Sequence, residues 1–248
     1  MTLRSAATGV LTLACLAATG PAGAHEFIVK PEAIADGKQS FSVIVTEVYM
    51  QPDRMPPATT AVMALGGDAP GAVSLTEDAA AKRLTGTVAV GKTPMILAGT
   101  SVRLGKPRGK DKAAAKTGGM RKIETFSKAL INAKAGDSLH MRPLGTRLEV
   151  LPKTNPATLA PGDAMTVRVL FDGKPVAARV QATYDGFSDK EHGYVTRTTS
   201  DDDGTARFAV TAPGLWLVRA KVRRDEAGAD YQRYEASANI VFNVAAAK

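Results

Sequence analysis

Three histidines carry the most specific chemistry in this chain: His25, His140 and His192. Imidazole nitrogen binds nickel, copper, zinc and iron, so each is a candidate metal ligand. His25 directly follows Ala22-Gly23-Ala24, a small-residue pattern typical of a signal-peptidase site. Cleavage after Ala24 would give His25 a free α-amine beside its imidazole, which together form a chelating pair. We therefore predict that His25 binds a metal ion, with His140 or His192 as partner ligands.

Each histidine also has a plainer interpretation. His25 could simply begin the first strand of the mature protein. His140 lies between two predicted strands and His192 lies in the polar segment 188–193, so both could occupy solvated loops. No two histidines have the close spacing of a local metal motif. Any shared site must therefore be assembled from segments that are distant in the sequence.

The first 24 residues have the features of an export signal. Arg4 provides a positive charge, and residues 10–18 form an apolar run that is too short to span a bilayer. We expect residues 1–24 to be removed as a signal peptide and the mature protein to be periplasmic. The single cysteine, Cys15, would leave with the signal. The exported fold would then be held without disulfide bonds.

The positive charge of the chain is concentrated in one segment. The formal net charge is +8, and residues 103–122 contain eight basic side chains against one acidic one, Asp111. This segment contains several glycines and no aromatic residue, which predicts a long loop and argues against nucleic-acid binding. As an alternative to a purely solvated loop, the segment could dock on an anionic membrane surface or an acidic partner.

Sequence signatures of enzymes are missing from the chain. It has no Gly-x-Ser-x-Gly, His-Glu-x-x-His, phosphate-binding loop or dinucleotide fingerprint, and no cysteine after the predicted cleavage site. The sequence therefore favours a protein without catalytic activity.

The hydrophobic pattern is that of an all-β protein. Met165, Val167, Val169 and Phe171 alternate with polar residues, and Asp172-Gly173 provides a turn before a second alternating run, 176–182. In that run we expect Arg179, Gln181 and Thr183 to face solvent. Similar short runs at regular spacing predict strands at 41–46, 61–65, 72–76, 84–90, 95–104, 122–131, 148–151, 193–200, 205–210, 216–223 and 231–244. Residues 51–57 contain three prolines and predict a loop.

A break in the strand pattern divides the predicted mature chain. Residues 151–156 contain two prolines beside Thr154 and Asn155, which is typical of a linker. We expect an N-terminal β-sandwich domain at 25–151, which includes the basic loop, and a C-terminal β-sandwich domain at 152–248.

Several motifs resemble those of one known family. They are the opening His25-Glu26-Phe27-Ile28-Val29-Lys30-Pro31, the run Leu144–Pro152, the run Val169–Val176 and the segment Gly214–Leu217. In this order and over nearly the whole mature chain, they resemble a bacterial domain-of-unknown-function family. Its periplasmic members are often named nickel or cobalt uptake accessory proteins (NikM-like). The resemblance implies an immunoglobulin-like or transthyretin-like β architecture and a link to transition-metal transport.

Three functions are compatible with the sequence. The first is a periplasmic binding or accessory protein that handles nickel, cobalt or copper, and delivers the ion to a membrane importer. The second is a non-catalytic interaction or adhesion module with no metal. The third is a copper mono-oxygenase with a histidine brace, which would require a second histidine close to His25.

Overall fold

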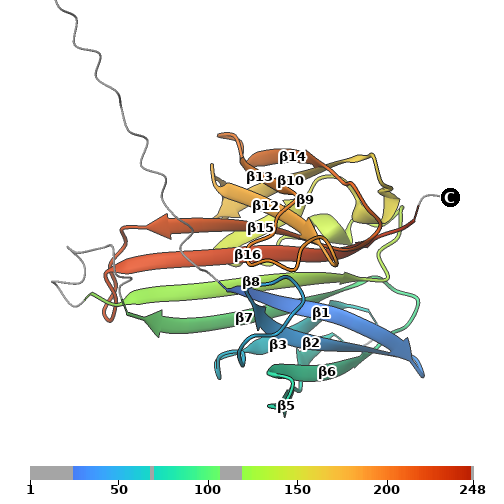
Figure 1. Cartoon of the computed structure of the whole chain (residues 1–248), viewed down its shortest axis with the longest axis horizontal. Helices are drawn as coiled ribbons and strands as arrows, with labels where there is room; N and C mark the ends of the chain where they lie inside the picture. The colour runs from blue at the N-terminus through green and yellow to red at the C-terminus, as the bar shows by residue number, and fades with distance from the viewer. Residues whose placement is uncertain (1–24, 68–69, 107–118, 247–248) are drawn as a thin grey trace, which may run out of the picture.

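The structure is a computed structural model that describes residues 25–67, 70–106 and 119–246. It is built from three β-sheets (Figure 1). The N-terminal sheet contains, in spatial order, β1 (Glu26–Ala35), β2 (Lys38–Thr46), β6 (Arg83–Ala89) and β5 (Thr76–Asp78). In the C-terminal sheet, β10 (Ala164–Phe171) pairs with β9 (Leu148–Pro152), β11 (Lys174–Pro175) and β14 (Thr205–Ala209).

The third sheet, here called the central sheet, has eight strands and lies between the other two. Its spatial order is β13 (Thr196–Thr199), β12 (Arg179–Tyr184), β15 (Gly214–Arg224), β16 (Arg233–Val244), β8 (Arg121–Ile131), β7 (Met95–Gly105), β3 (Ala61–Gly66) and β4 (Gly71–Val73). The helical elements among the described residues are two 3-10 turns, η1 (Leu139–Met141) and η2 (Pro156–Thr158). None of the described helices has the length and apolarity needed to cross a membrane. The predicted all-β fold with packed sheets is confirmed.

The middle of the central sheet is buried on both faces, each against a different partner sheet. Along β7, Ile96 belongs to the core shared with the C-terminal sheet, whereas Leu97 belongs to the core shared with the N-terminal sheet. On β15, Trp216 likewise packs in the core shared with the C-terminal sheet, and Leu217 packs in the core shared with the N-terminal sheet. Successive side chains of a strand point to opposite faces, so these strands must be apolar on both.

The central sheet joins strands from both halves of the chain. β16, the last strand, pairs in parallel with β8, from Arg233 beside Arg121 to Val241 beside Ala129. The predicted boundary after residue 151 falls inside β9, which hydrogen-bonds to β10 in the C-terminal sheet. Strand pairing therefore links the segments 25–151 and 152–248 in both the central sheet and the C-terminal sheet.

The double burial of the central sheet corrects one expectation from the sequence. Gln181 and Thr183 were expected to face solvent, but both are buried. Gln181 accepts hydrogen bonds from the guanidinium of Arg219 on the neighbouring strand, at 2.7 Å from Nη2. Alternating polar residues normally indicate a face in contact with solvent. Here that face is buried, and the polar group of Gln181 is hydrogen-bonded to another side chain inside the protein.

β1 is fixed across the central sheet by buried hydrogen bonds. The backbone N–H of Val29 donates to Ser127 Oγ at 2.9 Å, and the Asn239 side chain donates to the Phe27 carbonyl at 2.7 Å. Ser127 also donates to Asn239 Oδ1 at 2.6 Å, which completes the network. A Cβ at Gly99 would lie 2.4 Å from the Val29 side chain, so the close approach of β1 requires glycine there. These contacts set the position of His25, the residue before β1.

Candidate metal centre

His25 lies at the start of the described chain, opposite the end of β2. In the β1–β2 hairpin Glu26 is paired with Thr46, which places His25 beside Glu47, the first residue after β2. His25 Nε2 is 2.8 Å from Glu47 Oε1. The turn at Asp36–Gly37 has a positive φ at both residues and sets this pairing, with one register shift between Pro31 and Ile34.

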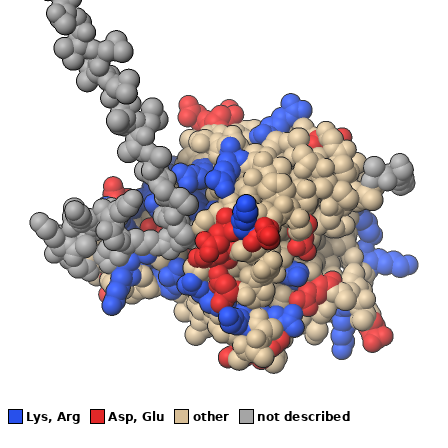
Figure 2. Space-filling model, in the orientation of Figure 1, with Lys and Arg blue, Asp and Glu red and all other residues tan. Residues whose placement is uncertain are grey.

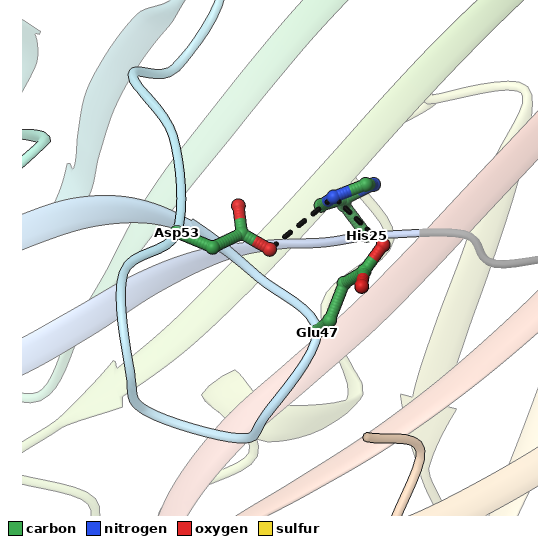
Figure 3. Close-up of side chains that lie close together, drawn as sticks. All are labelled: His25, Glu47 and Asp53. Carbon is green, nitrogen blue, oxygen red and sulfur yellow. Dashed lines mark ion pairs between the residues drawn. The ribbon is translucent and has the colours of Figure 1, made fainter.

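The second acidic neighbour of His25 comes from the proline-rich loop that follows β2. This loop folds back on the strand, because the Asp53 N–H donates to the Val45 carbonyl at 3.0 Å and Arg54 forms a β-bridge with Val45. The Asp53 side chain then points toward His25, with Oδ2 at 3.2 Å from Nε2 (Figure 3). The loop predicted at residues 51–57 is confirmed, and its return path brings the second carboxylate to the histidine.

His25, Glu47 and Asp53 have the geometry of a metal-ligand set. One ligand atom from each lies within 4.8 Å of the other two, and among the described residues they are the group of His, Cys, Asp and Glu with this property. Ligands at about 2.1 Å from a metal are about 3.0 Å apart at right angles and about 3.4 Å apart in a tetrahedron. The two distances from His25 Nε2 fit these values, so one nitrogen and two carboxylates could hold a divalent ion.

An arginine competes for the same position. Arg54 Nη2 contacts His25 Nε2, and Arg54 Nε lies 3.4 Å from Asp53 Oδ1. The Arg54 side chain is 57% exposed, so it can swing into solvent at low cost. In the absence of an ion, its positive charge offsets the two carboxylates that surround the imidazole.

Glu26 holds the base of this site by pointing the other way, into the protein. Its carboxylate pairs with Arg219 in the interior and accepts a hydrogen bond from Tyr194 Oη at 3.1 Å. Burial lowers the pKa of Arg219 to about 9, so the guanidinium still carries its charge at neutral pH. The same burial raises the pKa of Tyr194, which keeps the hydroxyl protonated as a donor. Glu26 therefore anchors His25 and contributes nothing to the proposed ligand set.

The other two predicted ligands, His140 and His192, are not part of this group. His140 is buried in η1, where its Nδ1 lies 3.7 Å from Asp137 Oδ1, so the solvated-loop interpretation is wrong for this residue. His192 has a left-handed backbone, and its N–H donates to the Glu47 carbonyl at 3.1 Å. His192 thus supports the loop that carries Glu47 through its backbone.

Comparison with known proteins gives a family. Residues 22–224 match the family model described as a domain of unknown function, DUF4198. The chain belongs to this family. This agrees with the domain-of-unknown-function resemblance of the sequence motifs. No curated protein matches the chain. Among solved structures, it is similar to the D0-D1 domain of Intimin at 16% identity and a TM-score of 0.23, over 88% of this chain and 97% of that chain.

Proposed function

We propose that this protein is an exported, periplasmic binding protein that carries a transition-metal ion as cargo and passes it to a membrane importer. The single observation behind this proposal is the convergence of His25, Glu47 and Asp53. Nickel and cobalt are the leading candidates, because the mixed nitrogen and oxygen ligands suit them and the family resemblance suggests them. Copper is the third candidate. We propose no catalytic role.

The predicted export signal would add one further ligand. Cleavage after Ala24 frees the α-amine of His25, which could complete a chelate with the imidazole and the two carboxylates. A set of four nitrogen and oxygen donors, with water at other positions, is typical of sites for nickel and copper. Such a site forms only after export. Metal loading would therefore be restricted to the compartment in which the importer collects its cargo.

Release to a partner is compatible with how the ligands are held. The side-chain exposures of His25, Glu47 and Asp53 are 13%, 25% and 33%, so an ion here would be reachable from outside. Glu47 and Asp53 both lie in the loop after β2 and could move together. A site that must give up its ion benefits from such partial exposure, whereas a structural metal site is closed.

Metal titration tests the proposal. The full-length chain is expressed for export, its first residue is identified by mass spectrometry, and nickel, cobalt, copper and zinc are titrated by calorimetry. We expect binding in the micromolar range or tighter, and a loss of about a hundredfold (~2.7 kcal/mol) when Glu47→Gln and Asp53→Asn are combined.

The N-terminal sheet offers a matched control for these variants. Glu32 and Asp78 form a second pair of carboxylates around one partner, Arg83, at 3.2 and 2.9 Å, with no histidine. Replacing Glu32→Gln with Asp78→Asn should leave metal affinity unchanged. A chain with one extra residue before His25 isolates the contribution of the α-amine. Absence of binding for all four metals would refute the function and leave a salt-bridged His25 in an interaction module.

A further inference from the structure

One face of the central sheet changes character along its strands, from apolar to polar with several basic residues. Four neighbouring strands align in rows across this face, and the row inside the core is Leu97, Ala129, Val241 and Leu217. The next row, which anchors β1, is Gly99, Ser127, Asn239 and Arg219. The two rows beyond are Ser101, Thr125, Ser237 and Lys221, then Arg103, Ile123, Glu235 and Arg223.

The last two rows form a groove next to His25. His25 lines it together with four basic side chains and one carboxylate, namely Arg103, Arg121, Lys221, Arg223 and Glu235. β1 begins at Glu26, so the N-terminal sheet covers the apolar rows and ends where the basic ones begin. Figure 2 shows acidic and basic side chains gathered side by side on one face of the molecule.

Basic side chains outnumber acidic ones in the lining of this groove, by four to one. Glu235 Oε1 accepts from the buried Arg121 at 2.8 Å, and Arg223 lies at 3.7 Å from the same oxygen. Lys221 Nζ lies 3.6 Å from Glu26 Oε1, which Arg219 already neutralises. Glu235 therefore faces two guanidinium groups. A groove in which basic side chains predominate favours a carboxylate or phosphate group.

His25 belongs to both features, the metal-ligand set and the basic groove. A divalent cation on His25, Glu47 and Asp53 would sit at the edge of a groove that attracts anions. A ligand that carries both charges fits this pairing: a metal ion bound to a small polycarboxylate, whose outer carboxylate oxygens remain available. The groove volume of about 60 Å³ has room for one carboxylate group of such a chelator.

We infer that the protein takes its metal as a complex with a small polycarboxylate chelator. The basic groove binds a carboxylate of the chelator, and His25 with its two acidic neighbours binds the ion. This inference rests on the proposed function, because it requires the metal to bind at His25. It predicts selection between forms of the same metal: the chelate binds more tightly than either the free ion or the chelator alone.

Calorimetry with nickel(II), citrate, nickel–citrate, inorganic phosphate and phosphatidylglycerol vesicles tests the inference on the exported full-length protein. The groove variant combines Arg103→Gln with Arg223→Gln, two exposed residues outside the metal-ligand set. A matched control combines Lys174→Gln with Arg207→Gln, which are exposed on the C-terminal sheet. We expect nickel–citrate to bind at least about tenfold more weakly to the groove variant than to the parent and control, with unchanged affinity for free nickel(II).

The outcomes separate this inference from the proposed function. If citrate strips nickel from the protein with no ternary complex, or if the groove variant keeps full affinity for nickel–citrate, the inference fails and metal binding stands. If citrate or phosphate binds in the groove and no form of the metal binds, the metal function fails together with the chelate. If the groove variant loses binding only to phosphatidylglycerol vesicles, the groove serves a membrane surface and the inference is overturned.

Discussion

The exposed arginine beside the candidate metal centre gives the sharpest test of its chemistry. Arg54 contacts His25 Nε2 and lies near Asp53, which is where an ion would have to enter. The replacement Arg54→Ala removes this competing charge. The backbone bridge between Arg54 and Val45 does not depend on the side chain, so the loop path should survive. We expect the variant to bind divalent metal more tightly than the parent.

The size of the effect follows from Coulomb repulsion. A divalent ion and a guanidinium about 4 Å apart repel by about 2 kcal/mol in water. Because the Arg54 side chain is 57% exposed, it can move away and is screened by salt, which reduces the effect to about 1 kcal/mol. The expected gain in metal affinity is therefore about fivefold, and it should shrink as ionic strength rises.

Calorimetric titration with nickel(II) at low and high salt measures this gain. The matched control is Arg83→Ala, because Arg83 also bridges two carboxylates in the N-terminal sheet but has no histidine beside it. The control should leave metal affinity unchanged. If Arg54→Ala weakens binding, or affects it no more than the control does, Arg54 is not a competitor and the ion does not bind where we place it.

Two further predictions concern the framework of the site and the stability of the fold. Gly99→Ala would put a Cβ 2.4 Å from the Val29 side chain of β1, so it should lower the free energy of unfolding by about 1–3 kcal/mol and reduce the thermal midpoint. Gly136→Ala is the control: its Cβ would meet no atom within 4 Å, so stability should be nearly unchanged. Arg147 lowers the pKa values of Asp172 and Glu226 in the folded state. Their stabilisation is therefore complete above pH about 4, the unfolded pKa, and is lost as pH falls through the lowered folded pKa. Because both carboxylates are partly exposed, Arg147→Gln should reduce the free energy of unfolding by only about 1 kcal/mol at pH 7. The variant should also lose less stability than the parent as the pH falls. Thermal unfolding from pH 7 to pH 2 measures both effects. An unchanged acid slope in this variant would show that the ion pairs do not contribute.

The sequence located the strands but not their partners. Period-2 alternation at Met165–Phe171 and the turn at Asp172–Gly173 depend on neighbouring residues, so they can be recognised without a structure. The burial of Gln181 depends instead on Arg219, which is 38 residues away and satisfies its polar group. The parallel pairing of β16 with β8 joins segments about 110 residues apart, and no local pattern specifies it.

The metal site shows the same division. His25 was identifiable from the sequence, because the chemistry of a histidine at a predicted cleavage junction is local. Glu47 could be predicted from the sequence only to within one residue. A regular hairpin built on the Asp36–Gly37 turn, with no register shift, would place Val48 opposite His25. The shift moves Glu47 into that position, and only the return of the proline-rich loop brings Asp53 beside it.

Residue types and short-range periodicity thus determined the predicted export signal, the all-β class and the candidate ligand His25. Tertiary structure decided which groups surround that ligand, and it replaced His140 and His192 with two carboxylates. It also aligned basic residues from three strands, β7, β8 and β15, into one groove beside His25. The physical reason is that side-chain chemistry belongs to each residue, whereas ligand geometry and surface potential depend on the pairing of strands that are far apart in the chain.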